Sequence, residues 1–176
     1  MNVIIPSPAD VDRIRQIHLQ AFGEEERELV GDLAVELLIA TSEPPTLHLV
    51  AEVQGKLVGH VAFSPVRAKA DKEFLGYILC PLGVMPENQK VGVGTALVKA
   101  GLEKLSGSKT DAIFVYGDPQ YYGRFGFKAE SAVAYHPPYP LQYPEGWLAT
   151  VPKGQKLPVE PLDMECLEAL GKPELW

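Results

Sequence analysis

Basic side chains and long apolar runs are both scarce in this sequence. It has 16 Lys and Arg residues against 23 Asp and Glu, a formal net charge of −7 at pH 7. A phosphate backbone would repel that charge, so we expect no nucleic acid partner. Although 46% of the residues are hydrophobic, they form no run of about 18 residues, and no basic stretch leads into an apolar one near Met1. We therefore expect neither a membrane span nor a secretory signal.

Cysteine is scarce as well. The two cysteines, Cys80 and Cys166, fit neither a disulfide framework nor a metal-binding spacing. No pair of histidines has a metal-ligand spacing either, so we expect no metal. This composition suits a reducing compartment, and we expect the protein in the cytoplasm. The 176 residues are enough for a single domain, 1–176, with a substantial core.

The hydrophobic pattern predicts a mixed α/β (α+β) fold. We expect a central, mostly antiparallel mixed sheet of about seven strands with helices on both faces. A Pro- and Tyr-rich loop begins at His136 and opens a C-terminal extension over about 136–176. The predicted helices begin at Ser7 and Asp118 and cover 25–40, the stretch after Gly92 and 163–170. The predicted strands cover 3–5, 47–53, 56–66, 74–84, 112–116, 128–135 and 147–151.

The most informative segment runs from Val84 to Leu97, VMPENQKVGVGTAL. An apolar strand pattern leads into a Gln-x-x-Gly-x-Gly turn, and a helical pattern follows at once. The first N–H groups of a helix have no intrahelical partner, and the helix dipole favours negative charge there. Gly92 and Gly94 also lack the Cβ atoms that would hold a phosphate away from the backbone. We therefore expect a phosphorylated ligand.

Two common phosphate loops do not fit this segment. A P-loop has Lys and then Ser or Thr after its last glycine, whereas Thr95 and Ala96 follow Gly94. The dinucleotide fingerprint has Gly or Ala three residues after its second glycine, where this chain has Leu97. The fingerprint also has an acidic residue about 20 residues further on, and this chain has none at the expected place. Both alternatives fail on residue identity.

The segment resembles the coenzyme-A-binding motif of the GNAT superfamily of N-acetyltransferases. That motif is Gln or Arg, two residues, Gly, one residue, and Gly or Ala, with a Val-x-Pro upstream, here Val84 to Pro86. The resemblance implies acetyl-CoA as cosubstrate, with its pantetheine arm paired to the main chain at Leu82 and Val84. The backbone amides that would bind its pyrophosphate belong to Gln89, Lys90, Val91, Gly92, Val93, Gly94 and Thr95. The Lys90 side chain and Arg124 are further candidate phosphate contacts.

A glycine pair at a helix start also occurs for packing alone, and a second segment decides between the two explanations. Residues 117–127, GDPQYYGRFGF, resemble the family segment in which a Tyr precedes a terminal Gly-Phe. The resemblance implies that Tyr122 is the general acid facing the coenzyme sulfur. The alternative is that Tyr121 and Tyr122 both simply pack in the core, with their hydroxyls bonded to backbone or water.

The general base is less clear from the sequence. Many family members have a Glu on the strand before the loop, at the position of Cys80 here, and residues 74–84 contain no acid. We expect Cys80 to pack as a small apolar side chain rather than act as a nucleophile. His60 is the candidate base, directly or through a water, because the ordinary histidine pKa is about 6.5. A hydrogen-bonded structural role is its alternative. We expect His18 in the core or at its boundary, and His48 toward solvent or a sheet face.

The sequence thus predicts an acyltransferase that moves the acetyl group of acetyl-CoA to a primary amine of a small molecule or peptide. Transfer would be direct, within a ternary complex. The alternative is a non-catalytic acetyl-CoA or acyl-CoA-binding sensor, which the missing strand acid favours and the Tyr122 segment opposes. Transfer to a hydroxyl, or of a longer acyl group, stays open. Tyr139 and Tyr143 are candidate acceptor contacts, unless their loop is only a connector. The oligomeric state stays open between a monomer and a homodimer.

Overall fold

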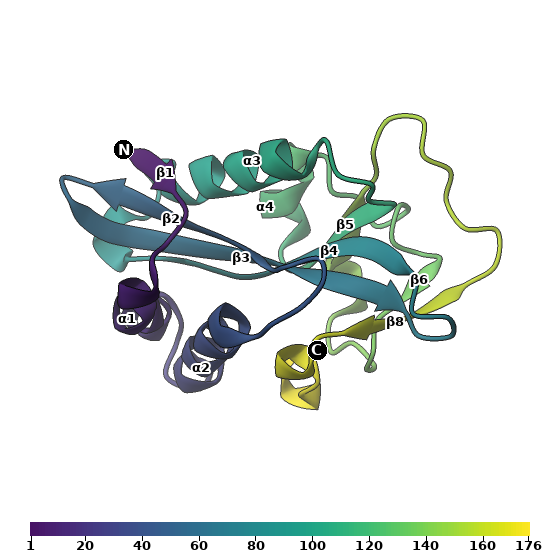
Figure 1. Cartoon of the computed structure of the whole chain (residues 1–176), viewed down its shortest axis with the longest axis horizontal. Helices are drawn as coiled ribbons and strands as arrows, with labels where there is room; N and C mark the ends of the chain where they lie inside the picture. The colour runs from purple at the N-terminus through teal and green to yellow at the C-terminus, as the bar shows by residue number, and fades with distance from the viewer. The chain divides into compact units, whose positions relative to one another are not determined.

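The computed structural model describes residues 1–176, and the chain groups into two compact units. Unit 1 consists of residues 1–63 and 80–105, and unit 2 of residues 64–79 and 106–176. Figure 1 traces the chain from the N-terminus to the C-terminus. Two strands, β3 (Lys56–Ala68) and β4 (Phe74–Val84), contribute residues to both units. A single domain over 1–176 stays a prediction.

In unit 1, local sequence signals set where the elements begin. The Asp10 carboxylate accepts hydrogen bonds from the backbone N–H of Ser7 at 2.7 Å and from its hydroxyl at 2.8 Å, as a capping pair does. The two predicted strands 47–53 and 56–66 are joined by a tight turn with positive φ at Gln54 and Gly55, 50° and 74°. The elements of this unit, besides parts of β3 and β4, are β1 (Asn2–Ile4), α1 (Val11–Ala21), α2 (Arg27–Ile39), β2 (Leu47–Val53) and α3 (Val93–Leu105).

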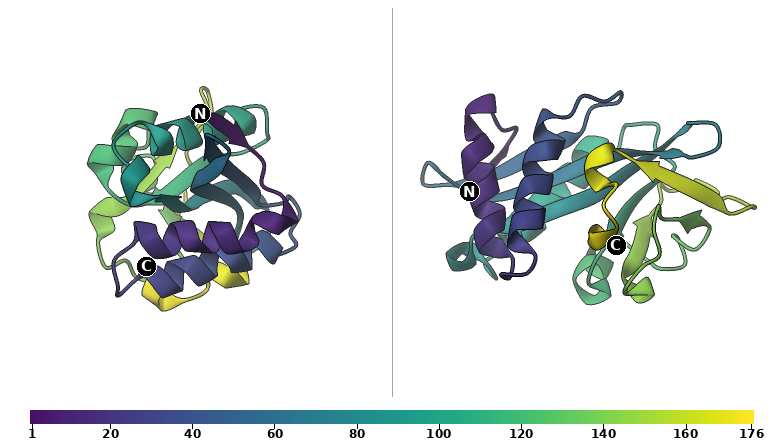
Figure 2. Two further views of the ribbon diagram at one scale, coloured as in Figure 1. Left: turned by 90° about the vertical axis from the view of Figure 1, so that its left-hand side faces the viewer. Right: turned by 90° about the horizontal axis from the view of Figure 1, so that it is seen from below.

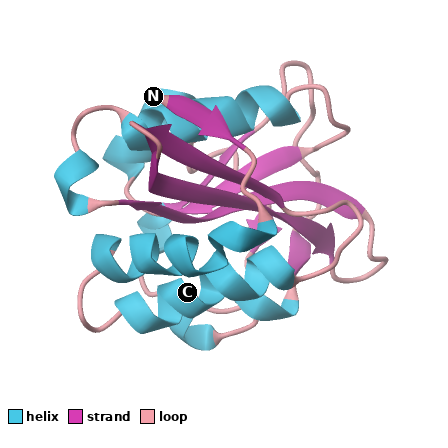
Figure 3. Cartoon of the chain, turned by 60° about the vertical axis from the view of Figure 1, so that its left-hand side comes forward, coloured by secondary structure: helices cyan, strands magenta, loops and turns pink.

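The helices of unit 1 cover both faces of its strands. Figures 2 and 3 show α1 and α2 side by side on one face of β1, β2 and β3, with α3 on the other. A buried cluster of Ile14, Ala34 and Val50 joins the two-helix layer to the sheet. On the other face α3 lies very close to β3, because a Cβ atom at Gly101 would stand 2.1 Å from Cε2 of Phe63. The face of α3 that carries Leu97, Gly101 and Leu105 is thus the buried one.

Unit 2 is organised around aromatic side chains. The Phe114 ring stacks on Trp147 with centroids 5.5 Å apart and meets Tyr135 edge-on at 4.8 Å. The Trp147 indole N–H donates to the Tyr135 carbonyl at 2.9 Å, which satisfies its buried polar atom. The elements here are β5 (Ala112–Tyr116), α4 (Pro119–Tyr122), β6 (Tyr135–His136), β7 (Trp147–Thr150) and β8 (Leu162–Cys166).

Six of the eight strands follow the order β1-β2-β3-β4-β5-β7, and off this path β8 pairs with both β3 and β6. Strand pairs β1-β2, β2-β3, β3-β8 and β5-β7 are antiparallel, whereas β4-β5 and β6-β8 are parallel. The predicted mixed α/β fold with a mostly antiparallel sheet is confirmed, with eight strands in place of about seven. No helix combines the length and the apolar character that crossing a membrane requires.

Two predicted elements were wrong. The strand expected over 128–135 is reduced to a bridge between Lys128 and Ala149 and the two residues of β6, because turns closed by backbone hydrogen bonds occupy the stretch between them. The helix expected over 163–170 is strand β8 followed by a 3-10 turn, Glu168–Leu170. Here the side chain of Met164 is buried while both its neighbours are exposed. This alternation suits a strand, and pairing with β3 and β6 supplies its hydrogen bonds.

Candidate functional site

The loop that joins β4 to α3 has an unusual backbone. Lys90 and Gly92 both have positive φ, 61° and 93°. No heavy atom lies within 4 Å of the place where a Gly92 Cβ would be, so this position requires glycine for its conformation and not for space. Residues Lys90, Val91 and Gly92 are exposed. A loop of this kind presents its N–H groups to solvent, where they can gather around an anion.

The first turn of α3 adds further donors. The N–H of Ala96 in α3 donates to the carbonyl of Gly92, the residue before the helix, at 2.9 Å. Val93, Gly94 and Thr95 precede Ala96 in the first turn of this 13-residue helix. Their backbone N–H groups precede the intrahelical ladder and carry the positive end of the helix dipole. Together with the exposed loop, they form a surface that fits a phosphate.

Gln89 closes this loop onto the end of β4. Its side-chain amide donates to the carbonyl of Val84 at 3.0 Å, and its backbone N–H donates to the carbonyl of Pro86 at 3.2 Å. The Gln of the motif therefore shapes the loop through its own hydrogen bonds. Leu82 and Val84 are half-buried in the last residues of β4, directly before this loop. Direct contacts of these residues with a ligand stay predictions.

His60 lies in a chain of three buried histidines within unit 1. Its Nδ1 is 2.8 Å from Nε2 of His18 on α1, and its Nε2 is 3.1 Å from Nδ1 of His48 on β2. The chain continues from Nε2 of His48 to the carbonyl of Leu37 at 3.2 Å. His18 and His60 are fully buried and His48 is 8% exposed. The core position expected for His18 is confirmed. Of the two positions left open for His48, solvent or a sheet face, the structure shows the sheet face, where its ring packs against His60.

Burial keeps all three rings neutral. It lowers the pKa of His18 to about 3 and lowers the pKa of His48, whose bond to the Leu37 carbonyl acts in the opposite direction. The pKa of His60 lies well below its ordinary value, through burial first and then through the neighbouring His18 and His48. A hydrogen-bonded structural histidine, the alternative for His60, has this geometry. The same geometry also suits a general base when the hydrogen-bonded row of histidines carries the proton away from His60.

Cys80 has the environment of a packing residue. Desolvation raises the pKa of its thiol to about 12, so the thiolate needed for a nucleophile is scarce near neutral pH. The raised pKa disfavours a nucleophile, and a small apolar packing role for Cys80, which is half-buried, stays a prediction.

In unit 2, α4 sets the directions of Tyr121 and Tyr122. The Asp118 carboxylate caps the helix by accepting the N–H of Gln120 at 2.8 Å, as predicted. The two tyrosine rings are 5.0 Å apart and nearly perpendicular, at 86°. Tyr122 meets Phe127 edge-on at 5.9 Å, and its ring covers Gly117, where a Cβ would stand 2.6 Å from Cε2. Gly117 therefore makes room for the Tyr122 ring.

Tyr121 packs differently from Tyr122. The Arg124 guanidinium lies 4.5 Å from the centre of the Tyr121 ring, and its Nε donates to the Tyr121 carbonyl at 2.8 Å. The ring also meets Phe125 at 5.6 Å. These contacts fit the packing role expected for Tyr121, and they engage Arg124 with its own segment. A phosphate contact by Arg124 stays a prediction.

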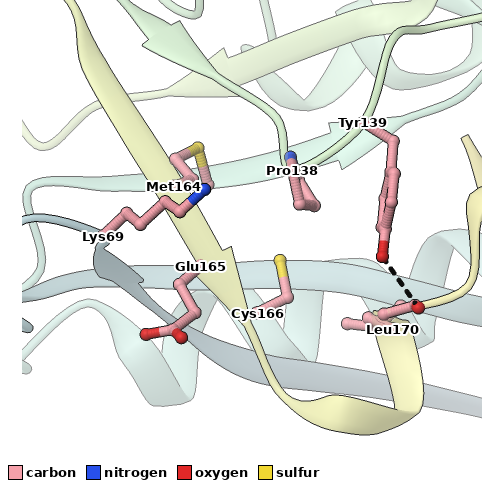
Figure 4. Close-up of a pocket in the computed structure, with 8 residues that line it drawn as sticks. Lys69, Pro138, Tyr139, Met164, Glu165, Cys166 and Leu170 are labelled. Atoms are coloured by element: carbon pink, nitrogen blue, oxygen red, sulfur yellow. Dashed lines mark hydrogen bonds between the residues drawn. The ribbon is translucent and has the colours of Figure 1, made fainter.

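The Pro- and Tyr-rich loop borders two cavities of unit 2. Figure 4 shows the first, of about 300 Å³, where the Tyr139 hydroxyl donates to the carbonyl of Gly171 at 3.0 Å. The second, of about 320 Å³, is lined by Tyr143 and Glu145 together with Tyr116 and Asp118. The backbone N–H of Tyr143 donates to the Tyr116 hydroxyl at 2.7 Å. Tyr139 and Tyr143 thus reach separate cavities, and a contact of either with an acceptor stays a prediction.

Comparison with known proteins gives consistent matches. The sequence model of the Acetyltransferase (GNAT) family matches residues 11–127. The chain is 37% identical over 139 residues to the uncharacterized N-acetyltransferase YjhQ of Escherichia coli strain K12, a match that covers 78% of this chain and 75% of YjhQ.

Two solved structures have the same fold. The GNAT family N-acetyltransferase YhbS of Escherichia coli, in complex with CoA, has a TM-score of 0.79 at 27% identity and covers 97% of this chain and 92% of its own. A GNAT family acetyltransferase of Brucella melitensis, in complex with acetyl-CoA, has a TM-score of 0.73 at 28% identity over 96% of each chain.

Proposed function

The chain belongs to the acetyltransferase (GNAT) family, and on that premise we propose that it transfers the acetyl group of acetyl-CoA to a primary amine. The acceptor would be a small molecule or a peptide, and transfer would be direct, within a ternary complex. The observation that carries this proposal is the loop before α3, with its left-handed Lys90 and Gly92 and the free donors that follow. Two similar solved structures hold CoA and acetyl-CoA.

The loop would bind the pyrophosphate of the coenzyme through the N–H groups that open α3. These donors need no rearrangement, because they already precede the helix ladder. The Lys90 ammonium would add a flexible positive charge, and the main chain at Leu82 and Val84 would pair with the pantetheine arm. The bound cosubstrate supplies a thioester that is activated toward amines.

Two side chains would move protons. The attacking amine must lose a proton, and His60 would accept it directly or through a water. The departing thiolate must gain one, and the Tyr122 hydroxyl would donate it. The role of Tyr122 rests on the resemblance of its segment to that of the family and on the capped helix that fixes its ring.

One observation favours the sensor alternative. Strand β4 has no carboxylate, and the histidine that would replace one is fully buried. Release of free coenzyme A, measured with a panel of primary amines, separates the two functions. Release that depends on one class of amine supports the transferase. Tight acetyl-CoA binding without release from any amine or hydroxyl acceptor would favour the sensor.

A further inference from the structure

The three buried histidines have a single consistent arrangement of hydrogens when all are neutral. The Leu37 carbonyl can only accept, so Nε2 of His48 carries a hydrogen and its Nδ1 does not. Nε2 of His60 must then donate to that Nδ1, and Nε2 of His18 must donate to Nδ1 of His60. Every ring is therefore protonated on Nε2, and every hydrogen bond of the chain points from α1 toward α2.

One end of this chain is an acceptor without a partner. Nδ1 of His18 is buried and has no hydrogen-bond partner, although a buried polar atom is normally paired. It faces Gly83 on β4, where a Cβ atom would stand 2.6 Å away. Gly83 lies between Leu82 and Val84, the two residues whose main chain we expect beside the pantetheine arm.

The other end can carry a positive charge more easily than the middle. His48 is the one ring of the three with some exposure, 8%. Its partner, the Leu37 carbonyl, belongs to the last turn of α2, since the last ladder bond there runs from Ala40 N–H to the Glu36 carbonyl. The C-terminal end of a helix stabilises a cation. His60, by contrast, lies fully buried between two other rings.

We propose that His18, His60 and His48 form a directed proton relay, which accepts a proton at Nδ1 of His18 and holds the resulting charge on His48. An N–H bond forms at Nδ1 of His18. The N–H bonds at Nε2 of His18 and of His60 break as new ones form at Nδ1 of His60 and of His48. One proton enters, His48 becomes an imidazolium, and the proton returns by the same path.

This relay rests on the proposed function, in which the acceptor amine must lose a proton. Both ring nitrogens of His60 are engaged, so in the relay the proton enters at His18 and reaches His60 from there, in place of direct transfer to His60. Three charged groups of α1 and α2 are held in ion pairs with one another. Arg15 on α1 is paired at 2.8 Å with Glu28 and with Asp32 of α2, and these carboxylates are largely exposed. On β2 and β3 the facing groups are His48 and His60 themselves. On β4 it is Gly83, which has no side chain.

Nitrogen-15 NMR of the histidine rings tests the relay without any activity. Near pH 7 all three rings should be protonated on Nε2. As the pH falls, His48 alone should become an imidazolium, while His18 and His60 switch their hydrogen from Nε2 to Nδ1. A neutral ring protonated on Nδ1 at pH 7, or an imidazolium at His18 with His60 unchanged, would overturn the proposal. So would unfolding before any ring of the chain gains a proton.

His48→Gln separates the relay from a structural role. Glutamine can still accept from His60 and donate to the Leu37 carbonyl, but it cannot hold a proton. We expect an unchanged rise in melting temperature with acetyl-CoA and a fall in kcat/KM of roughly 10²-fold near neutral pH, with an altered pH profile. His136→Gln, at an exposed histidine of unit 2, is the matched control.

Wild-type kcat/KM and pH profile in His48→Gln would overturn the relay and leave the acetyltransferase proposal intact. If the unmodified protein acetylates no acceptor, the proposed function fails and the NMR result decides on the relay.

Discussion

At the scale of single residues, Tyr121 and Tyr122 show how one capped turn gives two neighbours different surroundings. Asp118 and Pro119 fix the start of α4, so the two rings leave it nearly at right angles. Tyr121 packs under Arg124, whereas Tyr122 lies over Gly117. A role of Tyr122 as general acid therefore depends on its hydroxyl alone, which a change to Phe removes while the ring stays.

Tyr122→Phe should lower turnover and leave coenzyme binding nearly unchanged. If the hydroxyl protonates the departing thiolate, kcat should fall by roughly 10²- to 10⁴-fold at saturating acceptor. The melting temperature with and without acetyl-CoA reports whether packing and binding survive. Tyr121→Phe is the matched control and should keep most of the activity. Near-wild-type kcat in Tyr122→Phe would remove this residue from the mechanism.

The buried histidines predict a pH-dependent stability. Folding lowers the pKa of His18, His48 and His60, so below about pH 6.5 the unfolded chain binds protons that the folded chain does not. The stabilisation is fully present above that pH and is lost as the pH falls toward the folded-state values. The free energy of unfolding should decrease by up to about 1.4 kcal/mol per pH unit for each ring.

Urea unfolding at several pH values between 7.5 and 5 measures this slope, in a range where ordinary carboxylates titrate little. His48→Gln should make the free energy of unfolding depend less steeply on pH, because it removes one buried ring that only the unfolded chain protonates. Gly23→Ala, which changes no titratable group, should leave that dependence unchanged. A stability that stays flat from pH 7.5 to 5 would contradict neutral burial of the three rings.

At the scale of elements, α3 approaches β3 closely because each contributes a glycine to the contact, Gly101 on α3 and Gly59 on β3. A Cβ atom at Gly101 would meet the Phe63 ring at 2.1 Å, and one at Gly59 would stand 2.9 Å from the Leu97 side chain. The N-terminus of α3, which carries the free donors, is therefore positioned by a tight helix-to-sheet contact and not by the loop alone.

Gly101→Ala should destabilise the protein even though alanine favours helix. The added methyl group must displace the Phe63 ring or the helix, and overpacking of this kind costs about 1–3 kcal/mol. Gly23→Ala is the control, because nothing lies within 4 Å of its Cβ position, and its effect should stay within about 1 kcal/mol. Chemical unfolding of both variants gives the comparison. A Gly101→Ala protein as stable as the unmodified one would show that this contact can relax.

At the scale of the whole molecule, binding of acetyl-CoA should raise the melting temperature. A ligand that binds only the folded state stabilises it by about 2.7 kcal/mol at 100 times its Kd, or roughly 5–10 °C for a chain of this length. Nicotinamide cofactors and ATP should give much smaller shifts in the same scan. Equal shifts from all three ligands would be evidence against a coenzyme A site.

Gly92→Glu locates that binding in the loop. Glutamate would strain a backbone with φ of 93° and place a negative charge where a phosphate is expected. The acetyl-CoA shift should disappear, while the free protein should melt within a few degrees of the unmodified one, because the position is exposed. An intact shift in Gly92→Glu would mean that the phosphates bind elsewhere.

The sequence by itself determined the features that depend on near neighbours in the chain. The Ser7 and Asp118 helix starts, the Gln54-Gly55 turn, the full extent of β4 and the buried face of α3 all follow from capping, turn conformation and periodicity. The motif loop before α3 is local in the same sense. The first backbone N–H groups of α3 have no intrahelical partner because the helix begins there, and the glycine pattern marks that start.

Tertiary structure alone decided what depends on distant partners. The segment 162–166 is a strand because β3 and β6 pair with it. Its five residues alternate in burial, but a stretch this short needs those partners for its backbone hydrogen bonds. The histidine chain joins residues 42 and 12 positions apart, from α1, β2 and β3. Each of those rings alone suggests only a buried or half-buried histidine. Their shared hydrogen bonds, and the direction in which these point, exist only once helix and sheet have packed together.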